Sequence, residues 1–309
     1  MPELIDLSKV PVPDIIQPLN FEQRFAELKQ ILINIDERYQ DVVALESDPI
    51  TKLLQVFAYR EMHLVAQVND ATRGNILASS TGNDLIALGS RYNLTPLVIQ
   101  VGDNSAVPPI PEILEDEQSF KRRVQMAFDG LNTAGSIDGY VFFALGADGR
   151  VADASAVSPD PCEMVLTILS IEGDGIASAD LLTKVRAYFG LSADGLSQSP
   201  TPSKVRPQGD RVTIQSAEII NYNVEAQLQI LPGPDSQVVL AAANQALARY
   251  QNEQRRLGAD ITLSGIYKTL HQNGVNNVSL ISPAADVMIL DHQAAYCTNV
   301  DISIGGVGE

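Results

Sequence analysis

One stretch constrains the fold more than any other: a run of apolar residues at helical spacing that follows Asp48 and Pro49. Asp48 can cap a helix with its side chain, and Pro49 suits the first helical position. From there the apolar residues recur every three or four positions towards Leu77. An unbroken helix here would span about 28 residues and roughly 40 Å. We therefore predict a helix that is longer than one small domain normally needs.

A second helix is predicted just before it. Asn20 is a suitable N-cap, and the apolar residues that follow, from Phe21 to Val42, again recur every three or four positions. After these helices, residues 95–113 concentrate proline, glycine, aspartate and asparagine. Proline sustains neither a helix nor a central strand, so this stretch is predicted to be a linker.

Beyond Arg150 the period of the pattern changes. The stretches VADASAV and CEMVLTILSI predict strands, and the second is apolar on both faces, which indicates a central strand. RVTIQSA and YNVEAQLQI alternate at period two and predict a pair of half-buried strands. Helical patterns lie between and after these strands.

The predicted fold class is therefore α+β: a helical N-terminal region with long helices, followed by mixed α/β domains in which strands and helices alternate. We expect a helical region over residues 1–94, a linker over 95–113, a middle α/β domain over 114–231 and a C-terminal α/β domain over 232–309.

The charge balance excludes some classes of partner. The chain has 21 basic and 38 acidic residues, a net charge of −17. That field repels nucleic acid and disfavours an anionic membrane surface, so contact with other proteins remains. No apolar stretch reaches membrane-spanning length, and the first residues lack the pattern of a signal peptide. Cys162 and Cys297 are expected to be reduced, in a chain that folds in a cytosol.

A strand, the glycines of Gly173-Asp174-Gly175 and a helical pattern follow one another, as they do in a phosphate-binding loop. Ser178, however, stands where a dinucleotide-binding fingerprint has its third glycine. Glu172 and Asp174 would also place two negative charges against a pyrophosphate. We interpret the segment as a strand-to-helix turn that binds no cofactor.

Signs of catalysis are weak. His63, His271 and His292 have no second histidine or cysteine at metal-ligand spacing, and neither H-E-x-x-H nor G-x-S-x-G occurs. No metal or cofactor is predicted. A hydrolase whose catalytic triad is dispersed along the chain stays open as an alternative, because triads assemble across sequence. A standalone soluble oligomeric binding protein is the other alternative.

Several long blocks resemble, in the same order, the baseplate assembly protein J family of contractile-tailed phages. These blocks are residues 48–94, 130–159, 164–189, 205–234 and 256–275. The resemblance implies a structural subunit of the baseplate wedge, in a phage tail or a phage-derived tailocin. It would be made in the host bacterial cytoplasm and reside in the virion.

The resemblance also implies partners. The N-terminal helices would join a bundle with tail protein I, and a small lysozyme-related wedge protein would lie nearby. The C-terminal domains would pair with neighbouring copies in a sixfold ring around the central spike. The predicted partner interface consists of the apolar helix residues Phe21, Phe25, Leu28, Ile50, Leu54, Phe57, Met62 and Val65. Which helix face enters the bundle stays open, since Phe25 and Leu54 could pack against each other.

Overall fold

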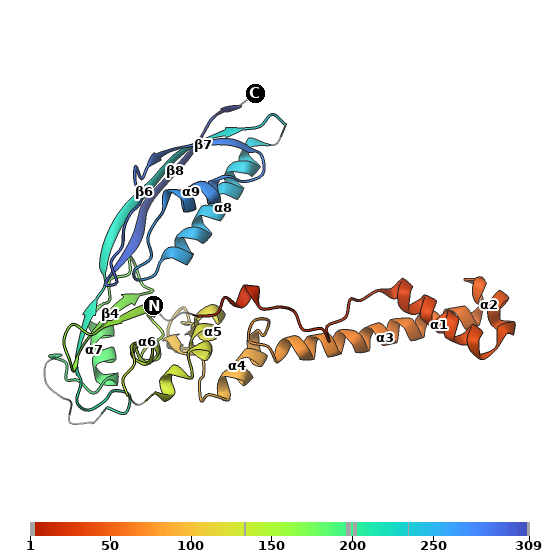
Figure 1. The fold of residues 1–309 in the computed structure, drawn as a ribbon, viewed down its shortest axis with the longest axis horizontal. Helices are drawn as coiled ribbons and strands as arrows, with labels where there is room; N and C mark the ends of the chain where they lie inside the picture. The colour runs from red at the N-terminus through yellow and green to blue at the C-terminus, as the bar shows by residue number, and fades with distance from the viewer. Residues whose placement is uncertain (1–3, 133, 196–198, 200–202, 234, 308–309) are drawn as a thin grey trace. The chain divides into compact units, whose positions relative to one another are not determined.

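The computed structural model describes residues 4–132, 134–195, 199, 203–233 and 235–307. The chain divides into two compact parts, Leu4–Thr95 and Pro96–Glu309, and each is described by itself (Figure 1).

The part from Leu4 to Thr95 is helical. Its elements are η1 (Leu7–Lys9), α1 (Phe21–Ile35), η2 (Glu37–Tyr39), α2 (Gln40–Ala44), α3 (Pro49–Gly74) and α4 (Gly82–Ser90). The predicted caps are confirmed: the side chain of Asn20 accepts a hydrogen bond from Gln23 N, and that of Asp48 accepts one from Ile50 N. α1 and α2 pack against α3, and Phe25, Val43 and Ala58 of these helices are buried, as are Leu85 and Leu88 of α4.

The first half of the second part holds a short hairpin and a three-stranded sheet. Its elements are β1 (Val98–Gln100), β2 (Ile113–Leu114), α5 (Glu117–Gln125), η3 (Asp129–Leu131), α6 (Ile137–Leu145), β3 (Val151–Val157), β4 (Glu163–Ser170), α7 (Ala179–Tyr188) and β5 (Arg211–Ser216). β1 and β2 pair antiparallel, within the stretch predicted to be a linker. The sheet order is β3-β4-β5, so the apolar strand β4 is central, as predicted.

The second half is a three-stranded sheet with helices on one face (Figure 1). Its elements are β6 (Glu218–Ile230), α8 (Ser236–Gln254), α9 (Leu263–Leu270), β7 (Val275–Ser282) and β8 (Gln293–Val307). The order is β7-β6-β8, with β7 antiparallel and β8 parallel to β6. Tyr222, Val224, Ala226 and Leu228 alternate along β6 into the core beneath the helices, while Gln227 between them is exposed.

The α+β prediction is confirmed, but one expected strand pair is wrong. β5 and β6 are both strands, yet β5 pairs with β4 and β6 pairs with β7 and β8. Ala217 separates them, and its N–H donates to Ile168 O at the end of the middle sheet. The predicted domain boundary at 231/232 would separate β6 from β7 and β8, although the three strands form one sheet.

Candidate partner interface

α3 has an inner face that packs against its own part of the chain. Thr51, Ala58 and Asn69 are buried there, and Leu54, Met62 and Val65 are half-buried along the same side. These positions recur at the three- and four-residue spacing that brings side chains onto one face of a helix. Ala58 is completely buried, which lets the helices approach closely at that level.

A second apolar stripe lies on another side of α3, flanking the inner face. It consists of Leu53, Phe57, Leu64 and Val68, and we call it the outer stripe. These side chains are 49% to 58% exposed. At 3.6 residues per turn the centre of the stripe is offset from that of the inner face by roughly 110°, about a third of a turn. A helix that is apolar on two sides is typical of one buried on both sides, and here only the inner side is covered within residues 4–95.

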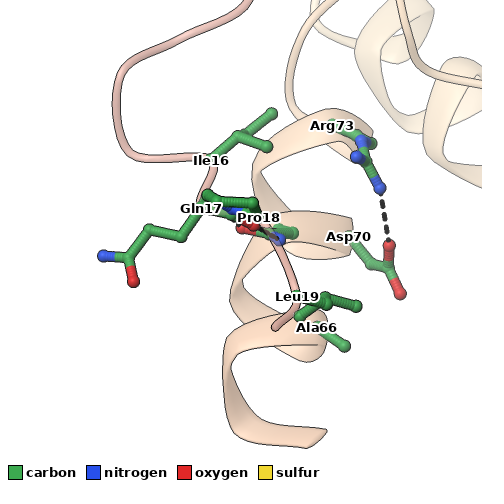
Figure 2. Close-up of a pocket in the computed structure, with 8 residues that line it drawn as sticks. Ile16, Gln17, Pro18, Leu19, Ala66, Asp70 and Arg73 are labelled. Carbon is green, nitrogen blue, oxygen red and sulfur yellow. Dashed lines mark hydrogen bonds and ion pairs between the residues drawn. The ribbon is translucent and has the colours of Figure 1, made fainter. Parts of the chain in front are cut away.

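The extended segment before α1 also packs on α3 (Figure 2). Asn69 forms both hydrogen bonds to the backbone of Gln17: its Oδ1 accepts from Gln17 N at 3.1 Å, and its Nδ2 donates to Gln17 O at 2.8 Å. A groove of about 620 Å³ lies beside this contact, and Asp70 and Arg73 form an ion pair at its rim, 3.3 Å apart. By helical spacing these α3 residues lie away from the outer stripe, which the segment therefore leaves uncovered.

The structure separates the eight predicted interface residues into three groups. Phe57 is exposed and belongs to the outer stripe, whereas Phe25 is buried within the helical part. The others, Phe21, Leu28, Ile50, Leu54, Met62 and Val65, are half-buried. The sequence interpretation missed Leu53 and Leu64, although each stands at helical spacing from Phe57. The interface itself stays a prediction.

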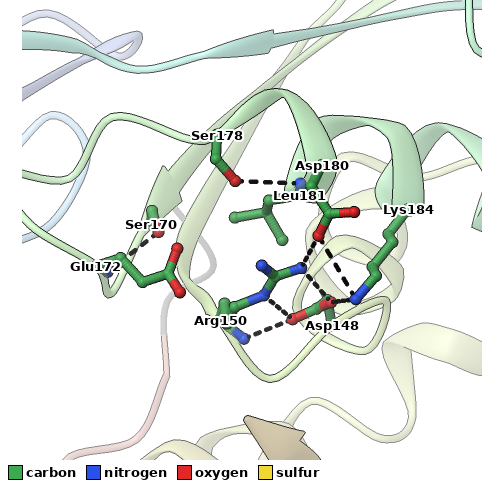
Figure 3. A network of polar contacts seen from close by, with 8 residues as sticks. All are labelled: Asp148, Arg150, Ser170, Glu172, Ser178, Asp180, Leu181 and Lys184. Atoms are coloured by element: carbon green, nitrogen blue, oxygen red, sulfur yellow. Dashed lines mark hydrogen bonds and ion pairs between the residues drawn. The ribbon is translucent and has the colours of Figure 1, made fainter. Parts of the chain in front are cut away.

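A cluster of charged side chains in the middle domain holds a loop against α7 (Figure 3). Arg150 Nε donates to Asp148 at 3.0 Å and its Nη2 to Asp180 at 2.8 Å, while Lys184 Nζ lies 3.6 Å from both carboxylates. Burial disfavours the charged form of Asp148, but the hydrogen bonds from Arg150 outweigh it and hold its pKa below the ordinary value. Opposite charges neutralise one another here, so the cluster fits a structural role.

The glycine loop follows β4 and contacts the C-terminal domain. Gly173 and Gly175 have φ angles of +56° and +111°, a region that favours glycine. A Cβ on Gly175 would lie 2.7 Å from Leu169 Cδ1 and 3.3 Å from Ile219 Cδ1. Gly173 O accepts a hydrogen bond of 2.6 Å from Arg255 Nη2. The loop thus packs one domain against the other.

Asp153 strengthens the same junction between the middle and C-terminal domains. Its side chain is almost fully buried and accepts from Arg122 Nη2 at 2.7 Å and from Leu257 N at 3.0 Å. A small apolar cluster, Leu169, Ala217, Leu257 and Ala294, lies between the two sheets. The junction therefore combines apolar packing with a buried charge that has partners on both sides.

Within the described residues, no group of three or more His, Cys, Asp or Glu side chains is arranged to hold a metal ion. No helix in that portion of the chain is long and apolar enough to cross a membrane.

The exposed outer stripe is typical of a helix that another protein surface covers, which fits a structural subunit of a larger assembly. The sequence comparisons give the family. Residues 46–103 match the family model of the Baseplate J-like N-terminal domain, and residues 222–303 match that of the Baseplate J-like protein C-terminal domain. The chain is 42% identical to "Baseplate protein J" of Escherichia phage P2, over 99% of both chains. It therefore belongs to the baseplate protein J family, whose role is structural, in a tail baseplate.

A structural comparison found a distant match. The chain is 13% identical, with a TM-score of 0.40, to a chain of the anti-feeding prophage baseplate, solved by cryo-electron microscopy and sixfold symmetrised. The match covers 67% of this chain and 49% of that one, about half of its length. At this TM-score the match carries no argument.

Proposed function

We propose that this chain is a wedge subunit of the baseplate of a contractile tail, in a phage or a tailocin, and that it acts without catalysis. The observation that carries the proposal is the 42% identity to phage P2 baseplate protein J along 99% of both chains. Identity of this extent covers the helical part and both sheets rather than one module.

The proposed division of labour follows the regions of the chain. Residues 1–94 form the wedge-bundle region and 95–113 the connection; the expected boundary at 231/232 moves to Ala217, so that the middle domain ends there and the ring-forming domain holds the whole β7-β6-β8 sheet. The outer stripe of α3 supports the first assignment, because its half-exposed apolar side chains need cover from another helix.

The partners are proposed in the same terms. Tail protein I contributes helices to the bundle, the small lysozyme-related wedge protein binds nearby, and neighbouring copies form a sixfold ring around the central spike. The chain is made in the host cytoplasm and ends in the virion. Its net charge of −17 keeps free subunits apart until specific apolar faces meet.

The test is deletion of the gene, followed by electron microscopy of the particles. We expect capsids or free tail parts without complete baseplates, and restoration by the intact gene supplied in trans. Antibody labelling of intact particles should mark the tail tip. Infectious or bactericidal particles that lack this chain would contradict the proposal, and turnover of a substrate by the purified chain would contradict its non-catalytic part.

A further inference from the structure

Among the described strands, β7 and β8 form the two edges of the C-terminal sheet. After Ala294, which forms a bridge with Leu257, no other described segment pairs with the outer side of β8. β7 likewise pairs only with β6 among the described strands. An edge strand presents unpaired backbone N–H and C=O groups, and proteins usually protect such edges with charges, prolines or bulges.

These two edges are largely unprotected by charge. β7 contains no charged residue, and β8 contains only Asp301; neither strand contains proline. Irregularities in the pairing with β6 leave a regular stretch at Asn277–Leu280 in β7 and another at Asn299–Ile304 in β8. These stretches are the parts of each edge where a further strand can add a regular ladder.

The side chains of the two stretches are compatible. Facing the helices, β7 has Val278 and Leu280, and β8 has Val300 and Ile302; Val300 is still 38% exposed. On the opposite, polar face Gln227 of β6 pairs with Ser279 on one side and with Ser303 on the other. A strand added in register would therefore place apolar beside apolar and polar beside polar.

We propose that the β8 edge of one copy pairs antiparallel with the β7 edge of the next copy, which continues the sheet from subunit to subunit. The direction follows from the topology: β8 runs with β6 and β7 runs against it, so the sheet can continue with its helices on the same face. Antiparallel pairing is also slightly more stable per residue than parallel pairing.

The occupant is a second copy, because repulsion between copies is weakest at these edges. In a chain of net charge −17, an uncharged β7 can meet β8 without opposing carboxylates. Pairing of β8 with the β8 of another copy would instead bring two Asp301 side chains close together. A head-to-tail contact of this kind closes into a ring when the rotation per copy allows it. The inference rests on the proposed ring and names the surface that forms it.

Cross-linking in assembled tails tests the contact. Two versions of the full chain, both carrying Cys162→Ser and Cys297→Ala, are co-expressed: one with Ser279→Cys and one with Ser303→Cys. Mild oxidation should form a disulfide between one version and the other and none between two copies of the same version. A Gln227→Cys version on the central strand is the matched control: it stands two strands, about 10 Å, from the neighbouring copy's cysteine, beyond the reach of a disulfide, and should link to neither.

Charge at the edge gives a second measurement. Ser279→Lys and Ser303→Lys should each deplete the chain from tails, whereas Gln227→Lys, in the same row but on the central strand, should not. Links only between like versions, or no links together with full incorporation of both edge variants, would overturn the inference. Tails that lack the chain altogether would instead contradict the proposed function.

Discussion

The helical part and the C-terminal sheet domain hide their apolar residues to different extents. In the sheet domain, β6 directs Val224, Ala226 and Leu228 beneath α8 and α9, and its other face is polar. In the helical part, α3 is apolar on two sides and only one side is covered. The sheet domain has its own core, whereas the described helical part leaves the apolar outer stripe exposed. Stability and assembly should therefore depend on different residues.

The largest effect is expected in the sheet domain. Leu228 is completely buried, so Leu228→Ala should lower the free energy of unfolding of residues 218–307 by about 2–5 kcal/mol, through lost burial and the cavity left behind. Hydrogen exchange measures this locally, which matters because a chain of several parts has no single unfolding free energy. Gln227→Ala, one residue away on the polar face, is the control and should change little. A similar loss for both variants would show that the two faces of β6 do not differ as described.

A smaller effect is expected on the inner face of α3. Ala58 is completely buried, so Ala58→Leu should overpack the contact between the helices and cost about 1–3 kcal/mol. Helix protection in residues 21–74, measured by hydrogen exchange, reports the loss. Ala71→Leu makes the same change at an exposed position of α3 and should be close to neutral. If Ala58→Leu is also neutral, the inner face is looser than its burial indicates.

Signals that are local in sequence predicted much of this molecule. The caps Asn20 and Asp48 lie beside the backbone groups that they satisfy, so a short window reveals them. The apolar run of β4 likewise indicated a central strand. Pairing between distant segments left no such signal. β5 and β6 are adjacent in sequence but lie in different sheets, and Asp153 accepts from Leu257 N, 104 residues away.

The candidate interface shows the same limit. Helical spacing identified α3 as apolar, but spacing alone cannot tell which apolar face its own part of the chain covers. Leu54 and Phe57 therefore entered one predicted set, although Leu54 is half-buried and Phe57 is exposed. The structure divides them because α1 packs on only one side of α3.

The smallest effect on stability is expected at the outer stripe, where the effect on assembly should be large. Leu53→Lys combined with Leu64→Lys changes two exposed positions to a good helix former, so stability should stay within about 0.5 kcal/mol. The same lysines would be buried without a partner charge if another helix covers the stripe, which is costly. We expect a folded chain by circular dichroism that is missing from purified tails. The control is Tyr59→Lys with His63→Lys, which adds the same charge at exposed positions on a different side of α3 and should be incorporated normally.

If the stripe variant unfolds, the stripe belongs to the chain's own core; if it folds and is incorporated like the control, the stripe is solvent-exposed in the tail. Either result would remove the contrast between the two regions, because the helical part would then need no partner to be complete.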